Sequence, residues 1–335
     1  MQPRLESTAA AQNGPVAFGA RVLRNLAAQD WIIAFYLLGL FIAVARGEGP
    51  GRTGAFTSLL GDSAMVAAGM IVTRGGIIKG APAAIIYRAS IFLALLLSYL
   101  QMREILPAVT TRSLDAEIYA FDLRWLHYEP SVAWDKYVSY GTTEWFAFFY
   151  FGYFFLLGMH IFPFMLFGGS GRLLHHFSLG IFIQFCTSHT LYMVVPGWGP
   201  YHHLTFEHAL TGGTFWSLVL QTVHAGSAMK DIFPSLHTGA PVFITLFSFI
   251  HRAHKPFKYT WPIMAFCVTQ IVIATMFLRW HYLIDIIAGA SLSCVSAFGG
   301  LAIVKWEERR RAAVGATPVF GEAPLAALAR RFGAG

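Results

Sequence analysis

Two short histidine-containing clusters carry the residue types and spacings best suited to chemistry. In the later cluster, His281 and Asp285 are four residues apart, so a helical segment would place them on one face. The carboxylate could then accept a hydrogen bond from one imidazole nitrogen and leave the other nitrogen basic. Arg279, two residues before the histidine, could neutralise a phosphate. This spacing predicts a histidine nucleophile or base beside an anionic substrate.

The earlier cluster surrounds His237, which could supply a proton. Pro234 is a good first residue of a helix, and the free N–H groups that follow it would form an anion site. Lys230 and the hydroxyl of Ser235 add donors. Together the clusters predict phosphoryl transfer, in which one histidine attacks phosphorus and the other protonates the leaving oxygen. Because lysine, arginine and helix N-termini supply the positive charge, neither a metal nor a cofactor is required.

The composition indicates which elements must position these clusters. Of the 335 residues, 56% are hydrophobic and only 12% are charged, about half the share of a soluble protein. Soluble, disordered, coiled-coil and disulfide-framework classes are therefore excluded. We predict an all-α, polytopic membrane helix bundle, since a span needs about 20 apolar residues. The eight candidate spans are 29–46, 55–73, 84–106, 145–167, 175–196, 235–251, 260–279 and 281–304.

The charge distribution predicts the orientation. With eight spans, the basic residues before the first span, in alternate loops and after the last span all fall on one side, which the positive-inside rule makes cytoplasmic. The net charge of +7 is therefore interpreted as a membrane signal and not as a nucleic-acid signal. Acidic residues of the segment 113–144 fall on the opposite side. We expect an integral, multi-pass protein with both termini cytoplasmic and the site on the outer, periplasmic or lumenal, face.

Four regions follow from this layout. Residues 1–28 form a cytoplasmic segment with an amphipathic helix at 16–28, and 29–106 supply accessory transmembrane helices. Residues 107–304 form the phosphatase- or phosphotransferase-like membrane domain, in which 107–144 and 197–234 carry helices at the membrane interface. Residues 305–335 form a basic cytoplasmic tail that we expect to be frayed from 312.

Two motifs give the chain a family resemblance. Pro234-Ser235-Leu236-His237 and His281-Tyr282-Leu283-Ile284-Asp285 resemble signatures of the type-2 phosphatidic acid phosphatase superfamily, and the likeness covers about 145–304. Leu236 and the Ala288-Gly289 step after the second motif resemble the inositol phosphorylceramide synthase branch. The resemblance implies a six-helix core, with His281 as nucleophile, Asp285 as its orienting partner and His237 as acid.

The chain also departs from the phosphatase pattern. The first signature, K-x-x-x-x-x-x-R-P, is missing, and a Pro- and Gly-rich segment at 195–201 stands in its place. We expect Tyr201 and His202, at the end of this segment, to contact the lipid headgroup. Thr275 stands where the phosphatases carry an arginine, six residues before the histidine. The phosphate clamp is therefore rebuilt or weaker than in the phosphatases, and Lys230 and Arg279 are assigned to it.

The favoured function is transfer of a phospho-headgroup from a lipid phosphate donor to a lipid hydroxyl, such as that of ceramide or a diacylglycerol. The close alternative is a phosphatidate or polyprenyl phosphate phosphatase, in which water is the acceptor. A transporter is a rival of another class, but we find no inverted repeat. A bis-histidine haem protein fits poorly, because Asp285 accompanies His281. His203 and Glu207 have ligand-like spacing, yet a wet interfacial loop is the preferred interpretation.

Overall fold

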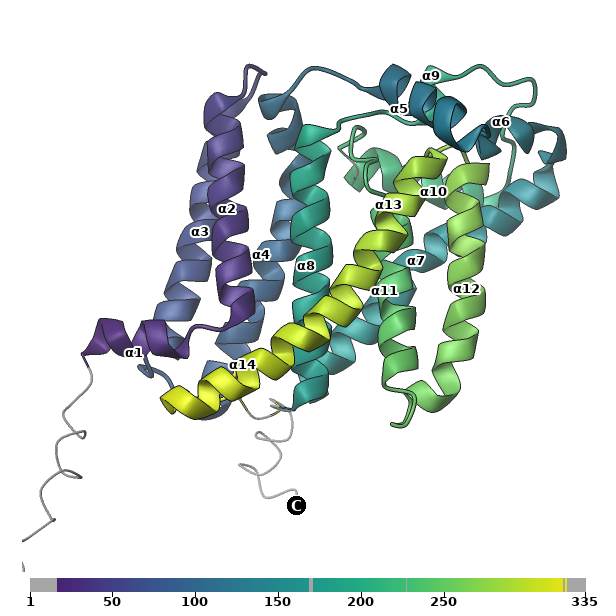
Figure 1. The fold of residues 1–335 in the computed structure, drawn as a ribbon. Helices are drawn as coiled ribbons and strands as arrows, with labels where there is room; N and C mark the ends of the chain where they lie inside the picture. The colour runs from purple at the N-terminus through teal and green to yellow at the C-terminus, as the bar shows by residue number, and fades with distance from the viewer. Residues whose placement is uncertain (1–16, 169–170, 227, 322, 324–335) are drawn as a thin grey trace, which may run out of the picture.

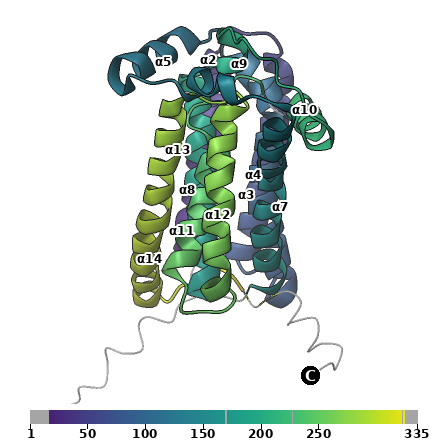
Figure 2. The same cartoon turned by 90° about the vertical axis from the view of Figure 1, so that its right-hand side faces the viewer.

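A computed structural model describes residues 17–168, 171–226, 228–321 and 323. Within these residues the chain forms helices and no strand, and the long helices pack as one bundle in which α7 and the last helix run obliquely to the others (Figures 1 and 2). Seven helices are long and apolar enough to cross a membrane: α2 (Ala28–Arg46), α3 (Arg52–Arg74), α4 (Gly80–Val109), α7 (Tyr140–Phe167), α8 (Arg172–Val194), α12 (Phe257–Phe277) and the continuous helix Leu283–Val314. The prediction of an all-α, polytopic membrane bundle is confirmed.

The sixth predicted span, 235–251, is present as a shorter helix. It is α11 (Leu236–Ile250), whose 15 residues extend about 22 Å, less than the roughly 30 Å of a bilayer core. Pro234 lies just before this helix and does not open it, because Ser235 is the N-cap. Leu236 and Thr238 in the first turn of this helix are buried within the protein.

The last helix is longer than the predicted span 281–304. It consists of α13 (Leu283–Cys294), the π-helical η3 (Val295–Gly299) and α14 (Gly300–Val314). The expectation of a frayed tail from 312 is wrong for the described residues up to 321. The chain after α14 packs back on the bundle, where Val319 and Phe320 are buried. Arg311 donates to the Thr317 carbonyl and fixes this return.

Short helices cover one end of the bundle, which we call the site end. Figure 1 shows them across the top of the long helices. They come from the two segments predicted to lie at the membrane interface. These elements are α5 (Asp115–Phe121), η1 (Asp122–Leu126), α6 (Pro130–Ala133), η2 (Asp135–Tyr137), α9 (Pro200–His203) and α10 (Thr214–Gly226).

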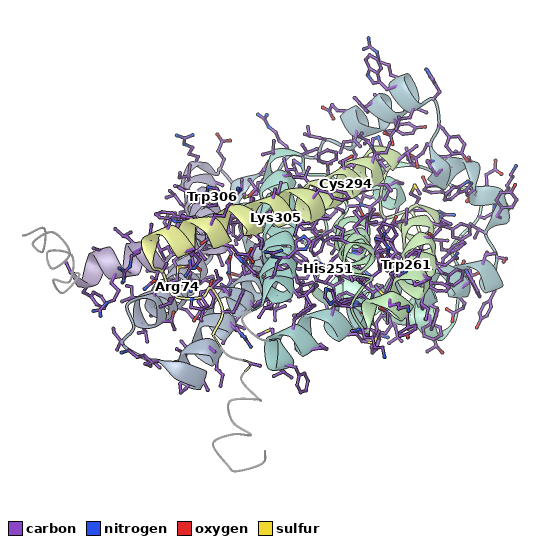
Figure 3. The ribbon with its side chains drawn as sticks, turned by 60° about the horizontal axis from the view of Figure 1, so that its bottom comes forward. Arg74, His251, Trp261, Cys294, Lys305 and Trp306 are labelled. Atoms are coloured by element: carbon purple, nitrogen blue, oxygen red, sulfur yellow. The ribbon has the colours of Figure 1, made fainter. Side chains whose placement is uncertain are left out.

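The opposite end holds both α1 (Phe18–Asn25) and the last turns of α14 (Figure 1). The helix predicted at 16–28 is therefore present. Figure 3 views this end and labels Arg74, which forms a buried ion pair with Asp30 at 2.8 Å. Arg74 also donates to the Val319 carbonyl at 2.8 Å, so one buried guanidinium joins α2, α3 and the chain after α14.

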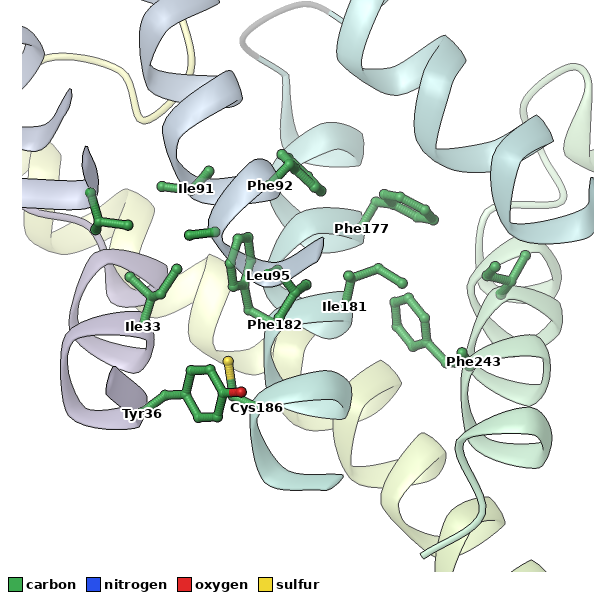
Figure 4. Packing of buried hydrophobic residues seen from close by; sticks show 14 of the residues in the cluster. Ile33, Tyr36, Ile91, Phe92, Leu95, Phe177, Ile181, Phe182, Cys186 and Phe243 are labelled. Carbon is green, nitrogen blue, oxygen red and sulfur yellow. The ribbon is translucent and has the colours of Figure 1, made fainter. Parts of the chain in front are cut away.

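The accessory helices pack directly on the C-terminal half of the chain. Figure 4 shows Ile33 and Tyr36 of α2 and Phe92 of α4 beside Phe182 and Cys186 of α8. All are part of one cluster of buried residues that extends to α11. Burial of this apolar surface holds α2 and α4 against α8, and α8 in turn packs against α11.

Candidate active site

The loop between α12 and α13 positions His281. The backbone turns sharply at Arg279, which has a φ of 67°, and the N–H groups of Trp280 and His281 then donate to the Thr275 carbonyl. His281 Nδ1 lies 3.3 Å from Asp285 Oδ2. The two residues do not share a helix face, because α13 begins only at Leu283. The contact has the geometry of a helix cap, in which the Asp285 carboxylate also accepts from the Tyr282 N–H at 3.0 Å.

Burial determines the charge state of His281. The side chain is only 5% exposed, and Asp285 behind it is fully buried. Burial lowers the pKa of His281 to about 4, although the Asp231 carboxylate and the Ile232 backbone oppose this shift. His281 is therefore a neutral imidazole near pH 7, with Nδ1 engaged by Asp285. A neutral imidazole with one nitrogen held by a carboxylate is the form in which histidine acts as a nucleophile or base.

His237 faces the same place from the first turn of α11. Its ring is stacked on Tyr150 at 4.4 Å between centroids, and its centroid lies 6.4 Å from that of His281. His237 Nε2 is buried and has no hydrogen-bond partner among the residues that the structure describes. A buried imidazole nitrogen without a partner is suited to exchanging a proton with a ligand.

Close helix packing holds the two histidines at this separation. The Ser235 N–H donates to the Asp285 carbonyl at 3.0 Å, which joins the starts of α11 and α13 directly. A Cβ on Gly289 would lie 2.4 Å from the Ser235 carbonyl oxygen, so only glycine allows this approach. Ser293 Oγ donates to the Gly239 carbonyl at 2.7 Å one turn deeper. Ser235 was predicted to bind the substrate, but its hydroxyl caps α11 by accepting from the Thr238 N–H.

Both histidines line a cavity at the site end, with a volume of about 50 Å³. This volume holds a few water-sized groups, so the acyl chains of a lipid could not enter it. Its walls are mainly aromatic. The ring-bearing residues that line it, besides the histidines, are Tyr99, Tyr150, Phe154, Trp198, Tyr201 and Trp280.

An apolar groove of about 630 Å³ begins where this cavity ends. Phe154 of α7 and Thr222 of α10 line both hollows. The groove continues along α7, where its other residues are Phe151, Phe155, Gly158, Met159, Phe162 and Pro163. From Phe154 to Phe162 the helix advances about 12 Å along the bundle. The cavity lined by the two histidines thus borders an apolar path on a membrane-spanning helix.

The two predicted clamp cations are held by other groups beside the cavity, and the Lys230 ammonium lies over the ring of Trp198. The Lys230 ammonium donates to the Thr111 and Arg112 carbonyls at 2.8 and 3.1 Å. Arg279 forms an ion pair with Asp135 at 2.7 Å and lies over the Phe206 ring. Neither residue lines the cavity.

The two residues predicted to contact the headgroup have different positions. Tyr201 lines the cavity, and its ring centroid is 4.9 Å from that of Trp280. The Tyr201 N–H donates to the Arg279 carbonyl at 2.9 Å, which seats the segment 195–201 on the loop before His281. His202 is exposed, does not line the cavity and stacks on Trp198 at 4.9 Å.

Several acidic residues organise the site and were not predicted as part of it. Asp115 is buried and accepts from the N–H groups of Trp198 and Gly199 and from the Tyr282 hydroxyl. Asp122 accepts from the Ile284 N–H at the start of α13. From the sequence, these carboxylates indicated only which side of the membrane the segment 113–144 faces. A sequence signal did exist, because acidic side chains within an aromatic-rich interfacial segment are costly unless they are paired.

Burial raises the pKa of Asp122 and of a further acid at the site end, Glu129. The pKa of Asp122 is raised to about 6 and that of Glu129 to about 7, in both cases mainly by burial. The Asp122 and Asp285 charges raise the pKa of Glu129 further. The start of α13 therefore lies among several acids, and protonation lowers their mutual repulsion.

Three residues at the site end have ligand atoms close enough together to hold a metal ion. They are Asp135, Glu207 and His208, whose ligand atoms lie within 4.8 Å of one another. The pair considered from the sequence was His203 with Glu207, so the structure gives Glu207 other neighbours. Asp135 Oδ2 already accepts from the Glu207 and His208 N–H groups, and Oδ1 from Arg279. Asp135 therefore connects the loop that carries Glu207 and His208 to Arg279, whose positive charge balances the Asp135 carboxylate.

These features define a multi-pass membrane protein whose site combines two facing histidines, a carboxylate and an apolar path. The sequence profile of the PAP2 superfamily matches residues 116–299, more than half of the chain. The chain belongs to the PAP2 superfamily, and it is an enzyme of the lipid phosphatase or phosphotransferase kind. Comparison with curated proteins and with solved structures gave no significant match.

Proposed function

We propose that the protein transfers a phospho-headgroup from a donor lipid to a lipid hydroxyl through a phosphohistidine at His281. One observation carries this proposal: His281, supported by Asp285, and the unpartnered His237 Nε2 face one cavity. The apolar groove that joins this cavity suits the chains of a lipid, because it lies on a membrane-spanning helix. The likeness of the two motifs to the inositol phosphorylceramide synthase branch favours transfer over hydrolysis.

The proposed reaction has two steps that balance in atoms and protons. His281 Nε2 attacks phosphorus while Nδ1–H donates to Asp285, and the bond from phosphorus to the donor's leaving oxygen breaks. His237, which enters this step as an imidazolium, gives its proton to that oxygen and becomes neutral. In the second step an acceptor hydroxyl returns a proton to His237 and attacks phosphorus, and the N–P bond breaks. An acceptor lipid gives a phosphotransferase, whereas water gives the alternative, a phosphatidate or polyprenyl phosphate phosphatase.

The test uses purified protein with phosphate-labelled lipids, with and without a lipid that carries a free hydroxyl. We expect a new labelled lipid only when the acceptor is present, and no product from His281→Ala. His160→Ala is a matched control, because His160 is also on a membrane helix but does not line the cavity. Free phosphate or a free phosphorylated headgroup as the sole product would favour hydrolysis. An unchanged label across the panel would refute the proposed enzyme and favour the transporter.

We also propose that the site end faces the outer side of the membrane. The support is the positive-inside rule. Exposed Lys258 lies in the first turn of α12 at the other end of the bundle, whereas exposed Glu117 lies on α5 at the site end. In a protein without its native cysteines, Glu117→Cys should react with a membrane-impermeant thiol reagent on intact cells. Lys258→Cys should react only after lysis. The reverse pattern would contradict the orientation.

A further inference from the structure

One of the accessory helices lines part of the active-site cavity. Tyr99 of α4 lies in the cavity wall together with His237 and His281. The accessory helices α2, α3 and α4 all precede residues 116–299, which the superfamily profile matches. The cavity therefore includes a side chain from a helix outside the matched part of the chain.

A buried histidine fixes the ring of Tyr99. This ring is stacked on His189 of α8, with 5.9 Å between centroids and 25° between planes. His189 is fully buried, and its Nδ1 lies 3.0 Å from the hydroxyl of Tyr36 on α2. One histidine thus links α2, α4 and α8. Aromatic rings packed in this way have a defined orientation, so the accessory helices set the position of Tyr99 in the cavity wall.

The same helix also holds a second element of the cavity wall. Arg103, one turn after Tyr99 on α4, donates to the Ala225 carbonyl in the last turn of α10. A cation at the C-terminal end of a helix is electrostatically favourable. In turn, α10 supplies Thr222, which lines both the cavity and the apolar groove. Two residues of α4 therefore act at the site end, one in the cavity and one on its neighbour.

The polar groups of the cavity suggest what the Tyr99 hydroxyl does. Among the described residues that line the cavity, none is lysine or arginine, and Lys230 and Arg279 are held by other groups. Phosphate oxygens accept hydrogen bonds, which neutral donors can supply where no cation lies. The Tyr99 hydroxyl is such a donor, and no other residue that the structure describes forms a hydrogen bond with it. It is therefore available to a ligand in the cavity.

We propose that the Tyr99 hydroxyl donates a hydrogen bond to a non-bridging phosphate oxygen of the donor lipid, so that α4 supplies part of the active site. His281 attacks phosphorus, His237 protonates the leaving oxygen, and Tyr99 binds one of the two oxygens that stay on phosphorus. Hydrogen bonds to charged oxygens are stronger than those between neutral groups. This inference rests on the proposed function and names a further substrate-binding residue for that same site.

The first test compares Tyr99→Phe with Tyr192→Phe. Tyr192 is a matched control, because its ring also contacts His189, at 5.8 Å, but does not line the cavity. Phenylalanine keeps the ring at position 99 and its stacking on His189, so only the hydroxyl is lost. With the phosphodiester lipid of the labelled panel that has the highest turnover, we expect kcat/KM to fall about 10- to 100-fold in Tyr99→Phe. Its thermal midpoint should stay unchanged, and Tyr192→Phe should keep the wild-type kcat/KM.

Phosphorothioate lipids assign the hydrogen bond to one oxygen. Sulfur in place of one non-bridging oxygen gives two diastereomers of the same lipid, and sulfur is the weaker hydrogen-bond acceptor. In the wild-type protein, the diastereomer with sulfur at the oxygen that Tyr99 binds should be the slower one. Tyr99→Phe should remove this disadvantage and change the ratio of the two turnover rates about tenfold, whereas Tyr192→Phe should leave it unchanged. The ratio is measured within each variant, so partial misfolding does not change its meaning.

The two proposals fail in different ways. Wild-type kcat/KM in Tyr99→Phe would overturn the inference about Tyr99 while leaving a His281-dependent enzyme. A loss of activity that follows a loss of thermal stability, with the wild-type diastereomer ratio, would make Tyr99 a packing residue and would also overturn it. If no lipid gives a product that His281→Ala abolishes, the proposed function itself fails.

Discussion

The contact between α11 and α13 predicts a large effect from a single methyl group. In Gly289→Ala the new Cβ would lie 2.4 Å from the Ser235 carbonyl oxygen, and ordinary contact begins near 3.4 Å. The two helix starts must therefore separate by about 1 Å, or the backbone must deform. Overpacking of this kind costs about 1–3 kcal/mol of stability. The separation also moves His237 relative to His281, and a misplacement of about 1 Å can reduce turnover roughly 100-fold.

The assay compares kcat and thermal midpoint in Gly289→Ala and Gly152→Ala. Gly152 is the matched control, because it lies on membrane helix α7 and a Cβ there would meet nothing within 4 Å. Alanine has the higher helix propensity, so Gly152→Ala should be neutral or slightly stabilising. We expect Gly289→Ala to lose most activity even at temperatures where it stays folded. Wild-type kcat in Gly289→Ala would refute the argument that this helix contact sets the distance between the histidines.

Three further predictions concern charge. Because the pKa of His281 is lowered to about 4, its imidazole stays neutral and nucleophilic in mild acid. The kcat should therefore fall only as the pH drops through about 4. A fall in kcat centred near pH 6.5, the ordinary pKa of histidine, would contradict this. Because the folded-state pKa of Glu129 is about 7, its contribution to stability is lost as pH rises through 7. Glu129→Gln should therefore raise the thermal midpoint at pH 8 and change it little at pH 4. Equal changes in the thermal midpoint at the two pH values would exclude the raised pKa of Glu129 as the cause. Arg74→Met should cost about 3–5 kcal/mol, because Asp30 stays buried without its cation. Arg74→Met with Asp30→Asn should recover part of this loss in thermal melts, and no recovery would argue against the ion pair.

Much of the fold could be predicted because membrane spans depend on local composition. The predicted boundaries of 29–46 and 235–251 differ by one residue at each end or less from α2 and α11. The last helix was predicted ten residues too short, since its basic turns resemble a solvated tail. Its extension depends on Glu307, which pairs with Arg310 and Arg311, and on the buried return of Val319. Such long-range contacts leave no periodic signal in the sequence.

The sequence by itself determined the membrane bundle, the two histidine motifs and the spacing that brings His281 to Asp285. These features depend on residue type and short separations, which hydropathy and motif spacing report directly. Only the tertiary structure decided which charges reach the cavity. Lys230 and Arg279 lie close in sequence to the histidines, yet the carbonyls of residues 111 and 112 and the carboxylate of Asp135 hold them instead. Asp231, Tyr99 and Tyr150 reach the cavity from three parts of the chain. A buried charge pairs with whatever partner the fold brings near, and that choice is made in three dimensions.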